Sequence, residues 1–508
     1  MKIFFIRAPR YIWPFYSRDS SFWQPLGFAS LAGACRQEFP NLQIKIIDCP
    51  ILTMGWKTLS EVLTDEKPDV VCIGEETVSS PQGLRLAHLA KAINPDCINI
   101  AGGHFFTYMI KETLTHHSID FIVKYEGEET LLELLREIEG GARTFNHIKG
   151  IAFSDDGRVV ETPPRPLIRN LDQLPFPAYD LLPMNLYGRR SRNHPHLVSV
   201  EHSRGCTDRC EFCILWQHMA DRTCGEPIPK YRSKSPERCF EEVKYLAKKY
   251  DRKTFAWVDP TWNLDPAWCD RFSRLILRSG LKIQFTAWMR ADGVVRDEKL
   301  GILEKEVKAG LVQAMIGVER IRPKDLKALN KHNNSRVVTA EAFSIFRSKY
   351  PSVYTIGTMI YGLWDDTKSS LDELLSYGHK TGMDYGFFIP LTPNPGTKIW
   401  QEAKEKGRLA ARDFSAYNFH TPVMRTRALS RRSLENFYLM ILLKCSLPRL
   451  KEMLHFLFFE TNKRKRQVHS ALMRHGLYVV LRCLYNRFLH PFSDKLSLGS
   501  RRPTWYNS

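Results

Sequence analysis

Three cysteines stand close together in the segment Ser-Arg-Gly-Cys-Thr-Asp-Arg-Cys-Glu-Phe-Cys, where Cys206, Cys210 and Cys213 have the spacing C-x3-C-x2-C. Iron–sulfur clusters are held by cysteine thiolates, usually four of them. Three cysteines would hold three irons of a [4Fe-4S] cluster and leave the fourth iron open to another molecule. A partial zinc site is the alternative, but zinc sites prefer two C-x2-C pairs, and the chain has no second pair downstream.

The surroundings of the cysteines agree with a cluster. Apolar residues 197–200 predict a strand, and the cysteines follow it in a loop that contains Gly205. This loop, with the aromatic Phe212 before the last cysteine, resembles that of the radical S-adenosylmethionine (SAM) enzymes. The resemblance implies that the open iron binds the amino and carboxylate groups of SAM. It also implies that an electron from the cluster cleaves SAM to a 5′-deoxyadenosyl radical, which abstracts hydrogen from unactivated carbon.

The composition is that of an ordinary globular protein of two to four domains, with 508 residues, 43% hydrophobic and 25% charged. Twelve cysteines without a secretory signal indicate a reducing compartment, so we expect a cytoplasmic protein. The longest apolar candidate, residues 437–443, is far shorter than the ~18 residues of a membrane span. The formal charge is +19, and residues 414–508 hold 17 Lys and Arg against four acids.

The first 140 residues alternate between strand and helix patterns. Five such units with short connections predict an α/β fold with a doubly wound, flavodoxin-like parallel sheet. In such sheets ligands bind beyond the carboxyl ends of the strands. The expected strands are residues 2–6, 43–47, 70–74, 97–101 and 120–123, and the expected helices are residues 26–39, 56–65, 82–93, 105–116 and 128–139.

Small and polar residues occupy the loops after the third, fourth and fifth strands. Hydroxyls and glycines there would let a large ligand approach the backbone closely. The alternative is that they are only turn and capping residues, as the serines before Pro81 would be. The candidate ligand-binding residues are Thr77, Ser79 and Ser80, then Gly102, Gly103 and His104, and then Glu126 and Gly127.

These loops together resemble the cobalamin-binding domain of B12-dependent radical SAM enzymes. The resemblance rests on Pro25-Leu26-Gly27, on Gly102-Gly103 and on Glu126-Gly127-Glu128-Glu129-Thr130. One departure is the lack of Asp-x-His-x-x-Gly after the first strand, the motif whose histidine coordinates cobalt. We therefore expect no protein histidine beneath the cobalt, and a degenerate domain that binds no corrinoid stays open. His104 is an alternative ligand, although a lining or capping role suits it better.

A connector, residues 141–196, precedes a second run of strand–helix units. It holds an expected hairpin (148–153 and 158–161) and a proline-rich strap (163–183). Residues 197–410 then predict six strands and the helices between them, which fits the partial (β/α)6 barrel of radical SAM enzymes. The expected strands are 197–202, 254–258, 282–287, 311–319, 353–360 and 384–390, and the helices include 236–249, 266–279, 297–309, 337–349 and 369–381.

Charged residues stand at the ends of three of these strands, where barrels place their working residues. They are Asp259, Arg290 and Glu319. A carboxylate there can bind ribose hydroxyls, and an arginine can pair with the SAM carboxylate; the family resemblance suggests these roles for Glu319 and Arg290. As structural alternatives, Asp259 caps the next helix and Arg290 pairs with Asp292 or Glu319.

Residues 411–508 form a basic C-terminal region with helical patterns at 434–444, 448–459 and 472–489 and a run Lys463-Arg464-Lys465-Arg466. Three interpretations compete. The region is a helical cap on the barrel, a peripheral contact with an anionic membrane, or a nucleic-acid contact. The last is the least favoured because the region has no recognisable binding motif.

The resemblance to B12-binding radical SAM enzymes covers about residues 1–410, and the most similar members are the magnesium-protoporphyrin monomethyl ester cyclase-like proteins. It implies a [4Fe-4S] cluster, SAM and cobalamin, a small-molecule or lipid-like substrate, and a reducing partner such as flavodoxin or ferredoxin. We favour C-methylation of an unactivated carbon. Radical oxidation, cyclisation or rearrangement is the alternative, and a non-catalytic corrinoid sensor or a tRNA methylthiolase would be of another class. The scattered Cys35, Cys49, Cys72 and Cys97 argue against a methylthiolase.

Overall fold

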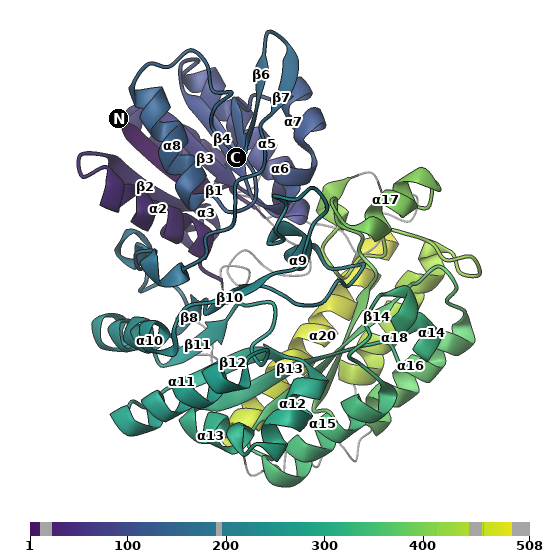
Figure 1. Cartoon of the computed structure of the whole chain (residues 1–508). Coiled ribbons are helices and arrows are strands. Elements are labelled where there is room, and N and C mark those ends of the chain that lie inside the picture. Colours follow the sequence, from purple (N-terminus) through teal and green to yellow (C-terminus); the bar gives the residue numbers. More distant parts are fainter. Residues whose placement is uncertain (11–22, 189–195, 412, 447–459, 461, 490–508) are drawn as a thin grey trace.

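The computed structural model describes residues 1–10, 23–188, 196–411, 413–446, 460 and 462–489. An N-terminal α/β unit stands above a larger barrel-like unit, and the short helix α9 lies between them (Figure 1). The first sheet has the order β2-β1-β3-β4-β5-β6-β7, and its first five strands are parallel. The doubly wound prediction is therefore confirmed for β1 (Lys2–Arg7), β2 (Gln43–Asp48), β3 (Val70–Gly74), β4 (Ile98–Gly102) and β5 (Phe121–Val123).

The side chains of β1 pack alternately into two separate cores, because successive residues of a strand point to opposite faces. Ile3 and Phe5 pack in the core that α2 and α8 share, and Phe4 and Ile6 pack in the core of α4 and α5. Both faces of the sheet are thus covered by helices, so we look for a ligand beyond the carboxyl ends of its strands. The helices of this unit are α2 (Leu26–Glu38), α3 (Cys49–Leu52), α4 (Trp56–Glu66), α5 (Ser80–Ile93), α6 (His104–Tyr108), α7 (Ile110–His116) and α8 (Glu128–Glu139).

Two features of this unit differ from the sequence prediction. The hairpin β6 (Ile151–Asp155) and β7 (Arg158–Glu161) pairs antiparallel with β5, so it extends the N-terminal sheet and is not part of a free connector. The expected helix 105–116 is two helices, because the backbone leaves the helical region at Met109 (φ −122°, ψ 39°).

The second sheet has the order β15-β14-β13-β12-β11-β8 and is parallel throughout, as the partial barrel requires. Its strands are β8 (Leu197–Val200), β11 (Thr254–Trp257), β12 (Gln284–Met289), β13 (Leu311–Glu319), β14 (Tyr354–Tyr361) and β15 (Tyr385–Pro390), and a small pair, β9 (Ser203–Gly205) and β10 (Tyr231–Ser233), stands beside β8.

The barrel helices follow the predicted order, with one difference. The expected helix 297–309 is replaced by two helices that meet at Gly301, whose φ of +66° ends one helix and begins the next. The helices are α9 (Ile214–His218), α10 (Pro236–Tyr250), α11 (Pro266–Ser279), α12 (Ala291–Lys299), α13 (Ile302–Ala309), α14 (Pro323–Ala328), α15 (Arg336–Lys349), α16 (Lys368–Lys380) and α17 (Lys398–Glu405).

A carboxyl group is buried under this barrel. Glu306 on α13 is fully buried and accepts a hydrogen bond from Trp262 Nε1. Burial, and then the nearby charge of Asp297, raise the pKa of Glu306 to about 8. The folded state therefore holds this proton more tightly than the unfolded chain does. The contribution of the protonated group to the free energy of unfolding is complete below about pH 4.5 and is lost as pH rises through 8.

Glu306→Gln should therefore remove this pH dependence. A glutamine keeps an acceptor for Trp262 and cannot ionise, so we expect the variant to unfold at a higher temperature than the wild type at pH 9 and at a similar temperature at pH 5. The gain at pH 9 has an upper bound of about 5 kcal/mol. Glu304→Gln, on the exposed face of the same helix, is the matched control and should show no such gain. Equal melting temperatures of wild type and Glu306→Gln at pH 9 would refute the assignment.

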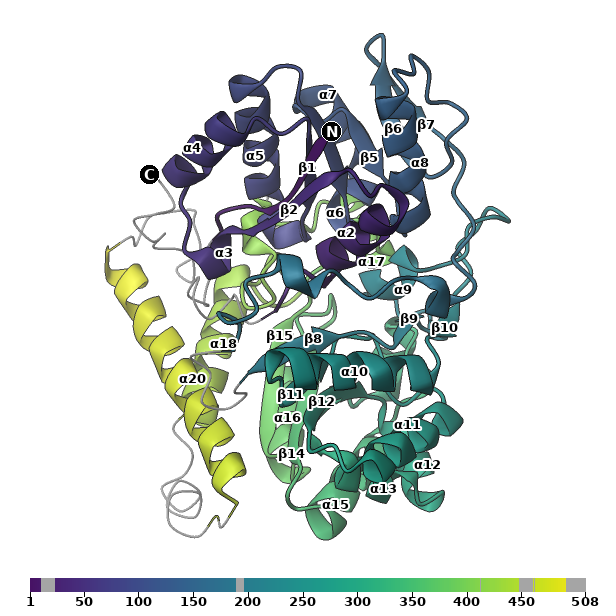
Figure 2. The same cartoon turned by 90° about the vertical axis from the view of Figure 1, so that its left-hand side faces the viewer.

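The C-terminal region packs against the barrel (Figure 2). Helix α18 (Arg431–Ser446) contacts β15 and α20 (Lys463–Leu489), so the helical patterns at 434–444 and 472–489 are confirmed. The expected helix 448–459 lies outside the described residues. Lys465 of the basic run forms an ion pair with Asp384 at 2.9 Å and is buried. Among the described helices, none has a stretch apolar and long enough to cross a membrane.

Candidate functional site

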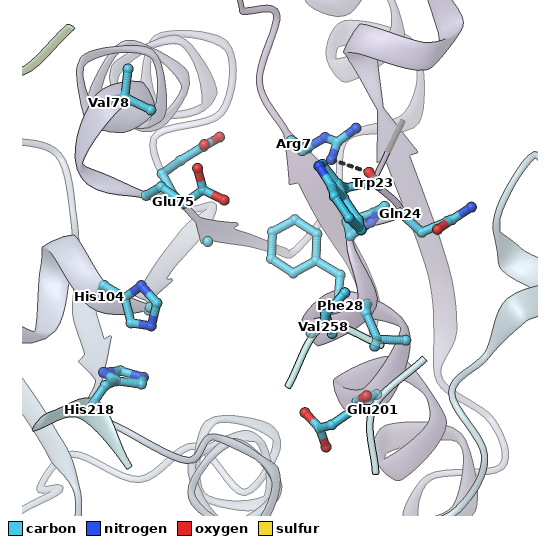
Figure 3. Close-up of a pocket in the computed structure, with 18 of the residues that line it drawn as sticks. Arg7, Trp23, Gln24, Phe28, Glu75, Val78, His104, Glu201, His218 and Val258 are labelled. Atoms are coloured by element: carbon cyan, nitrogen blue, oxygen red, sulfur yellow. Dashed lines mark hydrogen bonds between the residues drawn. The ribbon is translucent and has the colours of Figure 1, made fainter. Parts of the chain in front are cut away.

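A cavity of about 1310 Å³ lies between the carboxyl edge of the N-terminal sheet and the barrel. Its wall comes from both units. Figure 3 shows Glu75 and His104 from the N-terminal loops, His218 from α9, and Glu201 and Val258 from the strand ends of the barrel. Phe28 of α2 stands on the side opposite the two histidines. A ligand in this cavity would touch both units at once.

The loops after β4 and β5 line this cavity as predicted. Gly103 has φ +87°, a backbone conformation that favours glycine, and it lines the cavity beside Gly102, so bare backbone forms part of this wall. Such bare backbone suits a large flat ligand rich in amide groups, as cobalamin is. The lining residues that the sequence indicated are Gly102, Gly103, His104, Glu126 and Gly127.

The loop after β3 has the turn that the sequence left open as the alternative to a ligand loop. Thr77, Ser79 and Ser80 are not among the residues that line the cavity, because the chain forms a 3-10 turn there and turns these side chains into the protein. Ser79 Oγ accepts a bond from Arg10 at 3.0 Å, and Ser80 Oγ donates to the Thr77 carbonyl at 2.9 Å. Their neighbours Glu75, Glu76 and Val78 line the cavity instead.

A second histidine joins His104 at the cavity wall. The ring of His218, on α9, meets the ring of His104 edge to face with 4.5 Å between centroids (Figure 3). Burial lowers the pKa of both imidazoles, and for His218 the neighbouring His104 adds to this effect. Both rings are therefore neutral near pH 7. No spacing or motif in the sequence predicts that these two residues pair.

The three cysteines of the C-x3-C-x2-C segment are free thiols in the loop between β9 and α9. Backbone N–H groups point at two of the sulfurs. The Asp208 amide donates to Cys206 Sγ at 3.4 Å, and the amides of Leu215 and Trp216 at the start of α9 oppose the rise that burial causes in the pKa of Cys213. Amide donors of this kind stabilise thiolate ligands and tune iron–sulfur clusters, so the loop fits a cluster. The described residues hold no group of three His, Cys, Asp or Glu side chains arranged around a single metal ion.

Gly205 fixes the entry to the cysteine loop. Its φ is +82°, and a Cβ on it would stand 1.9 Å from the carbonyl oxygen of Lys230, the residue just before the neighbouring strand β10. We expect Gly205→Ala to break this pairing at a cost above about 4 kcal/mol, and iron content after reconstitution should fall severalfold. Gly225→Ala is the control, because Gly225 also has a positive φ (+98°) but open space around it. If both variants kept full iron content, the role given to Gly205 would be wrong.

A second cavity, of about 410 Å³, opens beside the cysteine loop, and its lining includes Phe212, Arg290 and Glu319. Glu319 is buried, has φ +58° and faces Lys331 across the cavity wall. Burial raises the pKa of Glu319 to about 7, and Lys331 opposes the rise. Lys331, Asn333 and Asn334 also line this cavity, and the sequence analysis missed them because they stand in a loop without a local pattern.

Arg290 is already paired within the protein. Its guanidinium donates to Asp292 at 2.9 and 2.6 Å and to Asp208 of the cysteine loop at 3.0 Å. One of the two structural alternatives, pairing with Asp292, is therefore present. Because Asp208 stands between Cys206 and Cys210, the same arginine ties this wall to the cysteine loop.

Asp259 takes neither of its expected roles. It is absent from the lining of both cavities and does not cap the next helix. Instead, one oxygen accepts the amides of His202 at 2.7 Å and Ser203 at 2.6 Å, and the other lies 2.8 Å from His202 Nδ1. These contacts lie just after the neighbouring strand β8, so the carboxylate holds the chain that leads into β9 and the cysteine loop.

A buried group of charges, which we name the Arg204 cluster, joins the two units. Arg204, two residues before Cys206, donates to Glu201 at 3.0 Å, to Glu126 at 3.1 Å and to Glu128 at 2.6 Å. Arg204 and all three glutamates line the larger cavity. Arg232 adds a second cation, 2.9 Å from both oxygens of Glu126. The Glu126 loop is thus held directly to the strand before the cysteines.

The two cavities meet inside the barrel. Alternate residues of β13 face inward, so Gln313 and Met315 line the larger cavity, and Met315, Gly317 and Glu319 line the smaller one. Asn418 and Phe419 of the C-terminal region are also common to both. The shared boundary of the two cavities is therefore Met315, Asn418 and Phe419. Phe419 has φ +59°, an uncommon conformation for a phenylalanine.

Comparison with known proteins agrees with this division. Residues 19–135 match the family model of the B12 binding domain, and residues 200–377 match that of the radical SAM superfamily. An uncharacterized methyltransferase of Pyrococcus horikoshii is 30% identical over 429 residues, which are 82% of this chain and 88% of that protein. The anaerobic magnesium-protoporphyrin IX monomethyl ester cyclase of Rubrivivax gelatinosus is 28% identical over 81% of this chain and 72% of that protein.

A solved structure has the same fold. The radical SAM methyltransferase TsrM of Kitasatospora setae, with cobalamin and a [4Fe-4S] cluster bound, superposes with a TM-score of 0.67 at 15% identity, over 94% of this chain and 99% of that one. The matches to the B12 binding domain and the radical SAM superfamily, on this fold, identify a cobalamin-binding radical SAM enzyme. The chain belongs to the family of cobalamin-dependent radical SAM methyltransferases, so its cofactors are a [4Fe-4S] cluster, SAM and cobalamin. When bound, the cluster and SAM supply a hydrogen-abstracting radical, and cobalamin carries the methyl group.

Proposed function

We propose that this enzyme methylates an unactivated carbon of a small, largely apolar molecule that binds at the boundary of the two cavities. The observation that carries this proposal is that Met315, Asn418 and Phe419 line both cavities. We assign the smaller cavity to SAM and the larger cavity to cobalamin, so a carbon held at their boundary is accessible from both. Met315 and Phe419 offer apolar contacts there, and Asn418 offers a polar contact.

The proposed roles of the site residues follow from their positions. Cys206, Cys210 and Cys213 hold the cluster. Glu319, beside Lys331, faces the SAM cavity, and Arg290 orients the cysteine loop through Asp208. We assign cobalamin binding to residues 1–140 with the hairpin, radical chemistry to 197–410 and substrate enclosure to 411–508. Cobalamin would contact Gly102, Gly103, His104, Glu126 and Gly127.

Radical cyclisation or oxidation without methyl transfer is the second candidate, because a relative that covers most of this chain is named as a cyclase. The two candidates differ in the fate of the SAM methyl group. A methylase places it on the product, whereas a cyclase or oxidase does not.

The proposed partners are an electron donor such as flavodoxin or ferredoxin and, for a lipid-like substrate, the surface of an anionic membrane in the cytoplasm. Support for the membrane contact is the excess of Lys and Arg in residues 414–508. Reduced flavodoxin should support SAM cleavage in place of a chemical reductant such as dithionite. Sedimentation with anionic but not neutral vesicles would support the membrane contact, and its absence in both would refute it.

The test of methylation uses SAM with a ¹³C-labelled methyl group. Reconstituted enzyme, with cluster and cobalamin, is incubated with SAM, reductant and an apolar small-molecule extract, and Cys210→Ala is the control. We expect a labelled product in the wild-type reaction alone. Formation of 5′-deoxyadenosine and a new unlabelled product would instead establish the cyclase or oxidase alternative.

A further inference from the structure

The larger cavity continues past the boundary into the barrel. There its wall changes from N-terminal loops to barrel strands and helix α20. Gln313 and Met315 of β13 and Ile356 of β14 form one side, and Val468 and Leu472 of α20 form the other. Ile356 and Val468 are buried and belong to one apolar cluster, with Met315 and Leu472 packed against it. This arm of the cavity, which we name the α20 channel, is therefore mainly apolar.

Helix α20 is fixed in place as a wall of this channel. Near its first turn, Lys465 pairs with Asp384 at 2.9 Å, and His469 lies 3.2 Å from the hydroxyl of Tyr354. These contacts join the helix to the beginning of β15 and β14. Val468, Ala471 and Leu472 follow at positions i, i+3 and i+4, so they share one face of the helix, and all three line the cavity. Figure 2 shows α20 running beside α18 along this side of the barrel.

The lining of the channel combines apolar and charged side chains. Met315 and Phe419 belong to the shared boundary. At α20 the lining also includes Tyr478 and the exposed Arg474. An apolar passage with a cation on its α20 wall is complementary to an amphiphile that has an apolar chain and an acidic group.

We propose that the α20 channel binds the apolar chain of an acidic amphiphile, with the acidic group near Arg474 and the distal carbons at the shared boundary. This substrate class deepens the proposed function and rests on it only for the identity of the reacting carbon. Binding of the chain itself requires no SAM cleavage, so the two ideas can fail separately.

The test is equilibrium dialysis of the cobalamin-loaded full chain against [¹⁴C]palmitate, since bound cobalamin keeps the probe out of the N-terminal part of the cavity. We expect one equivalent to bind. Ala471→Trp, which fills the channel, should weaken binding at least tenfold. Leu477→Trp is the matched control, because Leu477 lies on the exposed side of α20 (39% exposed), and it should bind like the wild type.

A second variant removes only the charge. Arg474→Gln, at an exposed position, should weaken palmitate at least threefold and leave binding of hexadecanol, which has no charge, unchanged. Absence of palmitate binding to the wild type would overturn the proposal. Equal binding by Ala471→Trp and the wild type would assign the fatty acid to the protein surface and overturn it as well. A labelled product in the methyl-transfer assay together with either result would leave methylation standing and reject the α20 channel.

Discussion

Cys210→Ala is expected to abolish the iron–sulfur absorption of the reconstituted protein and to lower 5′-deoxyadenosine formation at least about a thousandfold, a barrier increase of about 4 kcal/mol. Cys210 is buried in the cysteine loop, and its carbonyl accepts Trp216 Nε1 at 2.8 Å, so the backbone stays in place when the thiol is lost. Two thiolates cannot hold a four-iron cluster with a single open iron. Iron and sulfide analysis with quantitation of 5′-deoxyadenosine measures both effects.

The control for this variant is Cys224→Ala. Cys224 is a free cysteine on the surface, a short distance along the chain from the loop. It should keep full iron content and full SAM cleavage. A Cys210→Ala protein with the iron content of Cys224→Ala would show that the cluster is held elsewhere.

Arg204→Met should weaken the contact between the two units of the protein. The substitution keeps an unbranched apolar stem but leaves Glu126, Glu128 and Glu201 without their shared cation in a buried site. Removing one partner from a buried ion pair typically costs about 3–5 kcal/mol. We expect a lower melting temperature together with reduced loading of both cobalamin and the cluster, because the loop that lines one cavity is tied to the strand that leads into the other.

The pH dependence of this loss has a definite sign. Arg204 holds the pKa of Glu128 below its ordinary value against the opposing effect of burial. A carboxyl with a lowered folded pKa contributes stability above the unfolded pKa, and this contribution is lost as pH falls. The difference between Arg204→Met and the wild type should thus be large at pH 8, persist down to about pH 4.5, and shrink only below that, as pH falls through the lowered pKa of Glu128.

A surface arginine provides the control for Arg204→Met. Arg136 pairs with Glu38 at 2.6 Å, but both side chains are about half exposed. Exposed pairs contribute at most about 1 kcal/mol, so Arg136→Met should load both cofactors normally. An Arg204→Met protein that behaved like Arg136→Met would contradict the role of the Arg204 cluster, whereas partial recovery in Arg204→Lys would support it.

Sequence patterns predicted what is local in this protein. The cysteine spacing, the buried strands and the glycines after β4 are encoded within a few residues, and the structure has them where expected. Ser79 and Ser80 suit a ligand loop and an inward-facing 3-10 turn equally well, and the structure has the turn that the sequence left open as the alternative. Asp259 was likewise placed at the correct strand end but bonds across to the neighbouring strand.

Residues brought together from distant segments could not be predicted. Phe419 and Asn418 reach the shared boundary from the C-terminal region, and His218 meets His104 across the two units. Lys331 faces Glu319 from a loop that has no periodicity. None of these pairs has a spacing signal, because each depends on how the barrel packs against its neighbours.

The most direct test of the account is SAM turnover by the purified full chain, reconstituted anaerobically with iron, sulfide and hydroxocobalamin. Cobalamin that stays bound after gel filtration, together with both S-adenosylhomocysteine and 5′-deoxyadenosine in the mass spectrum after SAM and reductant are added, is the predicted result. Bound cobalamin without 5′-deoxyadenosine would contradict the radical chemistry, and loss of cobalamin would contradict the ligand assigned to the larger cavity.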